Sequence, residues 1–389
     1  MNKSLLQKNS YKNPVADFIV SRLLGYSERE TMNQAMKTSP FGATPVLWLW
    51  IALSLLLLIG LALFGAHLFI MHYYLPHLLR IFQEKPLFII PFGQPDPSAE
   101  NVRIPTSNGM TLSGCYLPAR GPRRGVILFG LEFGSKRWSC VPYCEFMRAQ
   151  GYDIFTFETR SQGESDPQPG YDPLQWVTEF EVDDFRAALA YLKSRPDADP
   201  RGVGFFGISK GANAGLLAAA ADPYIRCFVT DGAFATYTTM VPYEKKWLVI
   251  YCRSNLLAGA LPRWYYRYAA RRGLRDIETQ RCCRFVHLEP AIPRLAPRPL
   301  LMIHGGGDTY IKPEMARELF RHAAGPKEFW LVPKAKHNQA FQLATDEYKQ
   351  RVLEFFQKHL GPGTVKSPVP VPPSPMDPLL VSNSLTPNS

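Results

Sequence analysis

The chain has 389 residues, of which 46% are hydrophobic, 35 are prolines and 28 are glycines. This is enough apolar material for one large core together with accessory segments. The formal net charge of +11 suits attraction to anionic lipid headgroups or anionic substrates, although a basic surface without a specific partner is the simpler explanation. The sequence contains no helix-turn-helix pattern, zinc-finger spacing or RNP-type aromatic motif, so we expect no nucleic-acid binding.

The seven cysteines are irregularly spaced and their number is odd. An odd number excludes a complete disulfide framework, and no cluster of His and Cys residues completes a metal site around them. We therefore expect buried free thiols and no metal ion at the cysteines.

A long run without charged residues begins at Pro45. A helix needs about 20 apolar residues to cross a bilayer, and this run exceeds the roughly 7–15 apolar residues of a signal peptide. Trp48 and Trp50 at one end, and residues 72–74 at the other, suit the two headgroup regions. We predict one transmembrane helix over residues 45–75, and hence a single-pass membrane protein. A buried core helix is the alternative.

Three further segments differ in composition from the rest of the chain. Residues 1–44 are polar and lightly basic, and residues 76–100 form a proline-containing linker. Residues 361–389 are rich in proline, serine and asparagine, and they have too little apolar surface to fold alone, so we predict a disordered tail.

Between these segments, apolar runs of strand length alternate with helical patterns. The pair Asn108-Gly109 separates two alternating runs, which is typical of a hairpin. Near-continuous apolar strands that alternate with helices predict a mostly parallel, doubly wound α/β sheet over residues 101–360. The expected strands after the hairpin are Gly125–Phe129, Tyr152–Phe157, Val203–Phe206, Cys227–Thr230, Pro299–Ile303 and Glu328–Val332.

One interval, at about residues 233–297, contains no clear strand. Aromatic and basic residues gather in it, for example at Trp264–Tyr268 and at Arg271 and Arg272. We predict a mostly helical cap inserted over the carboxyl ends of the strands. Its Arg/Tyr/Trp segment suits a membrane surface, and an ordinary cap helix with a solvated basic face is the simpler alternative.

Residues Gly207–Gly211 read Gly-Ile-Ser-Lys-Gly and stand between an apolar run and a run of small and helix-forming residues. Strand, Gly-x-Ser-x-Gly and helix is the pattern of a nucleophile elbow, a tight turn that holds the serine in a strained backbone conformation. The two glycines are needed because the strand and helix backbones nearly touch. Ser209 is therefore the candidate nucleophile, with a purely structural elbow as the alternative.

A serine hydroxyl needs a base within hydrogen-bond reach, and that base needs an acid that holds its tautomer. In the elbow pattern the acid and then the histidine follow the serine along the chain. Asp308 comes after the predicted strand Pro299–Ile303, and His337 comes after Glu328–Val332. Carboxyl ends of parallel strands gather ligand groups at one edge of the sheet, so we predict a triad of Ser209, His337 and Asp308.

Other residues compete for two of these roles. His304 and His287 are alternatives to His337, but His304 precedes the acid and so has the wrong order. Asp231 is the alternative to Asp308, because it ends a predicted strand where such an acid occasionally lies. The oxyanion site needs two backbone N–H donors, which we assign to Lys210 and Glu132, with Leu131 as the alternative to Glu132.

With these motifs in place, the chain from about Asn101 to Leu360 resembles the α/β-hydrolase superfamily, and in particular its membrane-anchored serine hydrolases of the BEM46/ABHD type. The matching pieces are Asn108-Gly109, Phe157–Ser165, the elbow, Gly305–Asp308 and His337.

Two pieces depart from the family's pattern. The family's Asp-x-Arg-Gly-x-Gly-x-Ser loop has Glu158 and Ser161 here, and Gly130-Leu131-Glu132 stands where the family usually has His-Gly. The elbow also looks like that of acyl-CoA thioesterases and bile-acid acyltransferases, but a membrane anchor replaces their sandwich-like N-terminal domain.

The residues and the resemblance together predict a membrane-anchored serine hydrolase. It would cleave carboxylic ester or thioester bonds through an acyl-enzyme, with a small acyl ester or lipid-like substrate and the lipid bilayer as partners. This serine chemistry needs no metal ion and no organic cofactor. The alternatives are an acyltransferase or acyl-CoA thioesterase with the same triad, a serine peptidase, and a non-catalytic membrane-bound scaffold.

Overall fold

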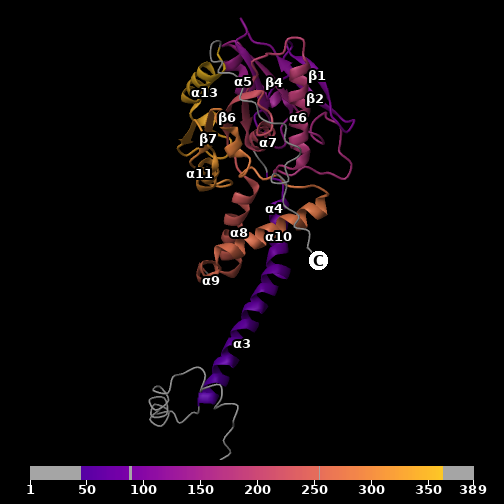
Figure 1. Ribbon diagram of the computed structural model, residues 1–389. Coiled ribbons are helices and arrows are strands. Elements are labelled where there is room, and N and C mark those ends of the chain that lie inside the picture. Colours follow the sequence, from indigo (N-terminus) through magenta and orange to yellow (C-terminus); the bar gives the residue numbers. More distant parts are fainter. Residues whose placement is uncertain (1–44, 87–89, 254, 362–389) are drawn as a thin grey trace, which may run out of the picture. The chain divides into compact units, whose positions relative to one another are not determined.

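The computed structural model describes residues 45–86, 90–253 and 255–361 (Figure 1). The chain divides into two compact units, Met1–Tyr73 and Tyr74–Ser389. The predictions for residues 1–44 and for nearly all of the C-terminal tail lie outside the described residues.

The first unit contains helix α3 (Pro45–Phe69), which leads into a π-helical turn at Ile70–Tyr74. Apolar side chains are exposed all around α3; Leu56 and Leu57, for example, are 64% and 65% exposed. Within the described residues, the helix over Val46–Gln83 is the one that is long and apolar enough to cross a membrane, with a mean hydropathy of 2.7 over its 18-residue window.

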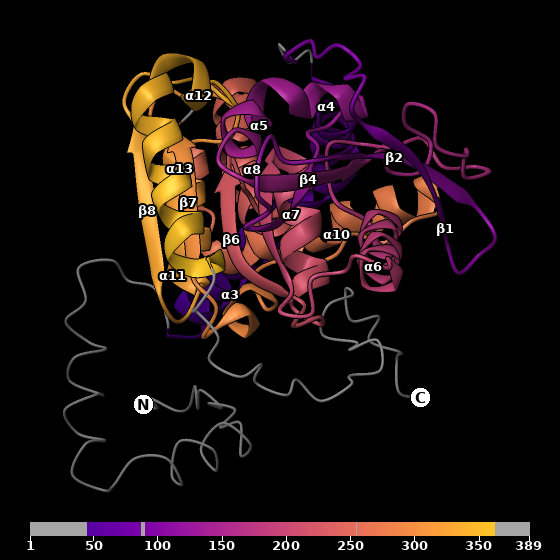
Figure 2. The same ribbon diagram turned by 90° about the horizontal axis from the view of Figure 1, so that it is seen from above.

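The second unit is built on one eight-stranded sheet in the order β1-β2-β4-β3-β5-β6-β7-β8 (Figure 2). The first two strands form an antiparallel hairpin, β2 pairs antiparallel with β4, and all later pairs are parallel. The strands are β1 (Glu100–Pro105), β2 (Thr111–Leu117), β3 (Gly125–Gly130), β4 (Tyr152–Phe157), β5 (Val203–Ile208), β6 (Ile225–Asp231), β7 (Leu300–Gly305) and β8 (Lys327–Val332).

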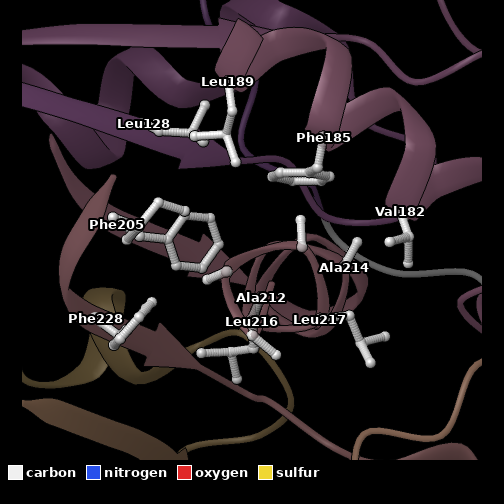
Figure 3. Close-up of a cluster of buried hydrophobic side chains, with 14 of the residues drawn as sticks. Leu128, Val182, Phe185, Leu189, Phe205, Ala212, Ala214, Leu216, Leu217 and Phe228 are labelled. Carbon is white, nitrogen blue, oxygen red and sulfur yellow. The ribbon is translucent and has the colours of Figure 1, made fainter. Parts of the chain in front are cut away.

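Helices cover both faces of this sheet. On one face, α6 (Glu179–Ser194), α7 (Ser209–Ala219) and α11 (Pro313–His322) contribute to a core that includes Phe185, Phe205 and Leu217 (Figure 3). On the other face, α5 (Val141–Arg148) and α13 (Thr345–Leu360) pack against the strands. Every residue of β3, β4, β5 and β7 is buried, as expected for parallel strands covered on both faces. The predicted fold class is confirmed.

Two regions outside the sheet bear on the candidate site. Between β6 and β7, the described residues contain α8 (Thr236–Cys252), α9 (Asn255–Ala260), α10 (Arg263–Arg281) and a 3₁₀ turn at Ile292–Leu295. Residues 76–100, which we predicted to be a linker, include most of helix α4 (Leu75–Gln83). The short helix α12 (Ala340–Leu343) precedes α13.

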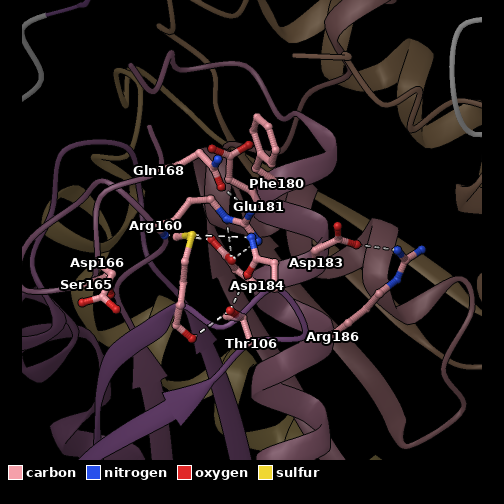
Figure 4. A network of polar contacts seen from close by, with 12 residues as sticks. Thr106, Arg160, Ser165, Asp166, Gln168, Phe180, Glu181, Asp183, Asp184 and Arg186 are labelled. Atoms are coloured by element: carbon pink, nitrogen blue, oxygen red, sulfur yellow. Dashed lines mark hydrogen bonds and ion pairs between the residues drawn. The ribbon is translucent and has the colours of Figure 1, made fainter. Parts of the chain in front are cut away.

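Helix α6 is joined to the loop after β4 by a buried ion pair (Figure 4). The Arg160 guanidinium donates to Asp184 at 2.6 and 2.8 Å, and the backbone N–H of Arg160 donates to the same carboxylate at 2.8 Å. Both side chains are almost fully buried, at 3% and 0% exposed. Burial raises the pKa of Asp184 to about 6, although Arg160 opposes the shift.

Asp183, the residue before Asp184 on α6, forms a comparable ion pair that is exposed to solvent. Asp183 accepts from Arg186 at 2.7 Å, but these side chains are 43% and 37% exposed. We predict that Asp184→Ala lowers the free energy of unfolding by about 3–5 kcal/mol, because it leaves the Arg160 charge buried without its partner. Asp183→Ala should cost less than about 1 kcal/mol. Chemical denaturation of both variants measures the difference, and similar losses in the two would contradict this account.

Candidate active site

The sequence predicted a tight turn between strand and helix at Ser209, and the structure has one. Ser209 follows β5 directly, begins α7 and has a φ of +50°, a left-handed conformation that costs energy for a residue other than glycine. A Cβ atom on Gly211 would lie 2.3 Å from the Leu131 carbonyl oxygen, and one on Gly207 would lie 2.5 Å from the Ala212 Cα atom. The turn is therefore possible only with glycine at both positions.

The three residues predicted as a triad lie together at the carboxyl ends of their strands. Ser209 Oγ is 3.0 Å from His337 Nε2, and His337 Nδ1 is 2.6 Å from Asp308 Oδ2. A carboxylate only accepts hydrogen bonds, so the His337 Nδ1–H donates to Asp308 and Nε2 is left to accept from the serine hydroxyl. This is the geometry in which a histidine acts as a general base toward a serine.

The loop after β7 orients the Asp308 carboxylate. The backbone N–H groups of Tyr310 and Ile311 donate to Asp308 Oδ1 at 2.8 and 2.9 Å. The other oxygen, Oδ2, faces His337. Because Oδ1 is fixed by the backbone, the side chain is held with Oδ2 directed at the imidazole.

The competing residues have other contacts. Asp231 Oδ2 accepts from the Tyr348 hydroxyl at 3.0 Å. His304 is buried, donates from Nε2 to the Ile311 carbonyl at 2.8 Å, and lies with the same nitrogen 3.5 Å from Asp308 Oδ2. His287 packs against the ring of Tyr237. Among the described histidines, His337 is the one that contacts both Ser209 and Asp308.

The two predicted oxyanion donors belong to adjacent segments. Lys210 is in the first turn of α7, where backbone N–H groups have no intrahelical acceptor. The Gly130–Glu132 segment lies against the same turn, because Gly211 touches both Gly130 and Leu131. Both candidates for the second donor, Glu132 and Leu131, therefore belong to the segment that faces the start of α7.

The sequence did not predict the role of the Glu132 side chain. This carboxyl group is buried and accepts a hydrogen bond from Asn338 Nδ2 at 2.5 Å. Asn338 follows His337 directly, so the bond ties the loop after β3 to the loop of the histidine. Burial raises the pKa of Glu132 to about 8 and that of Asp231 to about 7. In both acids, burial shifts the balance from the ionised carboxylate toward the neutral carboxyl group.

The Lys210 side chain was also missed. Its Nζ donates to Glu181 at 2.8 Å and to the Leu174 carbonyl at 2.6 Å, and the side chains of Lys210 and Glu181 are 4% and 1% exposed. Glu181 also forms the capping box of α6 with Thr178. A Thr-x-x-Glu spacing is a recognised helix-start signal, so the sequence held a clue to Glu181 but none to its partner.

Comparison with known proteins extends this description. The profile of the prolyl oligopeptidase family matches residues 177–363, which contain Ser209, Asp308 and His337. The YfhR protein of Escherichia coli K12 is 26% identical over 279 residues, covering 69% of this chain and 84% of its own. The polyketide transferase ATR5 of Stachybotrys chlorohalonatus is 25% identical over 294 residues, covering 67% and 97%.

Solved structures show the same fold. The Pyrococcus furiosus esterase Pf2001 superposes with a TM-score of 0.54 at 22% identity, covering 72% of this chain and 98% of its own. The α/β hydrolase GrgF from a Penicillium species superposes with a TM-score of 0.52 at 18% identity, covering 67% and 99%. Together with the eight-stranded sheet, these solved structures show that the chain has the α/β-hydrolase fold.

Proposed function

We propose that this protein is a membrane-anchored serine hydrolase that cleaves carboxylic ester or thioester bonds. The observation that carries the proposal is the contact series from Ser209 through His337 to Asp308, at 3.0 and 2.6 Å. The family match and the esterase neighbours support the same class of reaction.

In this proposal Ser209 Oγ attacks the substrate carbonyl carbon while His337 Nε2 takes the hydroxyl proton. The same imidazole then returns the proton to the leaving oxygen or sulfur, and an acyl group stays on Ser209. Water, deprotonated by His337, releases the acid. Asp308 holds the imidazole in the tautomer that these transfers need. The backbone N–H groups of Lys210 and Glu132 stabilise the oxyanion as charge develops on it.

Acyl transfer is the second candidate function. Two relatives are named as polyketide transferases, ATR5 and claH, the latter from Penicillium crustosum and 26% identical. The same acyl-enzyme would form, with an alcohol or amine in place of water. Product analysis with and without added acceptors separates the two reactions. Because the family match is to the prolyl oligopeptidase family, an amide panel beside the ester panel tests for peptidase activity.

We further propose that α3 anchors the protein in a bilayer as a single span. A helix that is apolar on every side is stable when it is buried or surrounded by lipid, and the α3 side chains are exposed. The second unit adds exposed apolar residues on α9 and α10, with Leu256 87% and Trp264 66% exposed, beside exposed arginines at Arg263 and Arg267. Such a surface suits anionic headgroups.

The triad assignment predicts how the enzyme reacts with a fluorophosphonate probe. The wild type should be labelled, and Ser209→Ala should not be, because the probe reacts with an activated serine. Asp308→Asn should slow labelling and ester turnover by on the order of ten-thousandfold, since the imidazole loses its tautomer.

Asp231→Asn is the matched control, because Tyr348 can still donate to the amide oxygen. It should change the labelling rate by less than about tenfold. A folded wild type that is never labelled would contradict the hydrolase proposal. A larger loss of labelling rate in Asp231→Asn than in Asp308→Asn would assign the role of the acid to Asp231.

The raised pKa of Glu132 predicts a pH effect on stability. In the unfolded chain this carboxyl loses its proton near its ordinary value of 4.5, whereas in the folded protein it does so at about 8. Between these values the folded state holds the extra proton, so its stability falls as the pH rises. Glu132→Gln cannot titrate and still accepts from Asn338. The melting temperature of the wild type relative to Glu132→Gln should fall from pH 5 to about 8 and then level off. Parallel curves would contradict the assignment.

The anchor predicts the behaviour of full-length protein that carries an N-terminal tag. The tagged chain should stay with membranes through alkaline carbonate extraction. The double variant Leu56→Arg/Leu57→Arg should be released, because each arginine near the bilayer centre costs about 2.5–3.5 kcal/mol. Leu343→Arg, at an exposed position on α12, should be retained like the wild type. Loss of the tag from membrane-free mature protein would indicate a cleaved signal sequence instead.

A further inference from the structure

A cavity of about 190 Å³ lies in the second unit between α4, α8 and the loop after β7. Its walls are mostly apolar and aromatic, with Leu78, Ile81 and Phe82 from α4, Trp176 from the loop before α6, and Trp247 from α8. Its two charged lining residues, Glu84 and Lys246, are exposed and so lie at its rim. A dry apolar cavity of about 150 Å³ is large enough for a benzene-sized group.

Helix α4 is a fixed wall of this cavity. The Phe82 carbonyl accepts from Trp176 Nε1 at 2.8 Å and from Gln175 Nε2 at 3.1 Å, which satisfies an acceptor at the end of the helix. The Phe82 and Trp176 rings stack with centroids 4.0 Å apart and an interplanar angle of 4°.

The other parts of α4 are held by the helices that follow β6. The Tyr74 hydroxyl donates to the Glu244 carbonyl of α8 at 2.6 Å. A Cβ atom on Gly273 of α10 would lie 2.7 Å from the Leu79 side chain, so α4 and α10 pack closely. The cavity wall is therefore held at its start, middle and end.

The cavity adjoins the candidate active site through two aromatic contacts. Tyr310 lines the cavity, and its ring lies edge-on to His337 with centroids 5.4 Å apart. Trp176 lies edge-on to Phe234 at 5.5 Å, and Phe234 is 6.4 Å from His337. Tyr310 therefore forms part of the cavity wall and also packs against His337.

We propose that a group bonded to Ser209 extends past His337 into this cavity, and that the cavity binds the acyl chain of the substrate, which is apolar. The inference rests on the proposed function and names its substrate class. The walls offer contact to an alkyl group, while the charges at the rim are in water. Transfer of each methylene from water into such a site is favourable, so longer acyl chains gain binding energy until the cavity is full.

The proposal also gives α4 a function. In the sequence, α4 follows the predicted span after only the turn at Ile70–Tyr74. The first helix after the span therefore forms a wall of the proposed acyl site. The cavity recognises the chain and not the group to which it is esterified. A membrane lipid and a soluble ester or thioester both satisfy it, and both belong in the test.

The test compares full-length variants in nanodiscs on acetyl, butyryl, octanoyl and dodecanoyl p-nitrophenyl esters, and on a phospholipid in the disc. In the wild type, kcat/KM should rise by up to about fourfold for each methylene that enters the cavity. Ile81→Phe fills the cavity, so it should lower kcat/KM for the octanoyl ester by at least about tenfold and leave the acetyl ester within about twofold. Arg80→Phe, on an exposed position of the same helix, should match the wild type on every ester.

Trp247 lines the cavity from α8, so Trp247→Ala should widen it. The ester with the highest kcat/KM should then carry a longer acyl chain than in the wild type. This keeps the proposal open to refutation even if Ile81→Phe does not fold. The proposal is overturned if Ile81→Phe and Trp247→Ala both keep the wild-type chain-length profile. Turnover of the soluble esters without turnover of the phospholipid would assign the chain to a soluble source.

Binding without turnover separates this inference from the proposed function. In Ser209→Ala, 11-bromoundecanoate should quench the fluorescence of Trp176 and Trp247, and adding Ile81→Phe should weaken the quenching while adding Arg80→Phe should not. A wild type that resists fluorophosphonate while this quenching persists would overturn the hydrolase and keep the cavity as an acyl site. Labelling of Ser209 without quenching would keep the hydrolase and overturn the cavity.

Discussion

The close approach of α7 to the strands beside it is the constraint on which the candidate site depends. Gly207 and Gly211 allow the backbone of the turn to touch Ala212 and the Gly130–Glu132 segment. That approach forces Ser209 to a φ of +50° and brings the first-turn N–H groups of α7 next to the loop after β3. The strained serine and the adjacent donor segment are thus two results of one packing contact. Any larger residue at Gly211 would separate them.

The loop that carries His337 is bonded to the same Gly130–Glu132 segment. Asn338 donates to the buried Glu132 carboxyl, so the residue after His337 is tied to the segment that faces α7. Asp308 is oriented by two backbone N–H groups of its own loop. These polar bonds are buried, where the loss of one partner is costly. The site is therefore held by loops that constrain one another, and not by the strands alone.

Sequence patterns predicted most of the fold and the members of the candidate site, for a physical reason. Strands that are buried on both faces give continuous apolar runs, and parallel strands bring their carboxyl ends to one edge, so the order of Ser209, Asp308 and His337 implied their proximity. The Glu132–Asn338 and Lys210–Glu181 pairs join residues far apart in the chain, which no local pattern encodes. Helix α4 was missed although Leu75, Leu78, Leu79 and Phe82 have helical spacing and Pro76 stands in the first turn, where it is tolerated.

That missed helix changes how the N-terminal region relates to the chemistry. If they were only a linker, the residues after α3 would do no more than connect the two units, and any sequence of suitable length would serve. As a packed helix, α4 contributes its Phe82 ring and carbonyl to contacts with Trp176, and Trp176 leads through Phe234 to His337. If the cavity binds the acyl chain, as we propose, the residues of α4 must satisfy both the packing of the second unit and the shape of that chain. Selection on substrate would therefore act on a segment that lies outside the strand-and-helix repeat of the hydrolase fold.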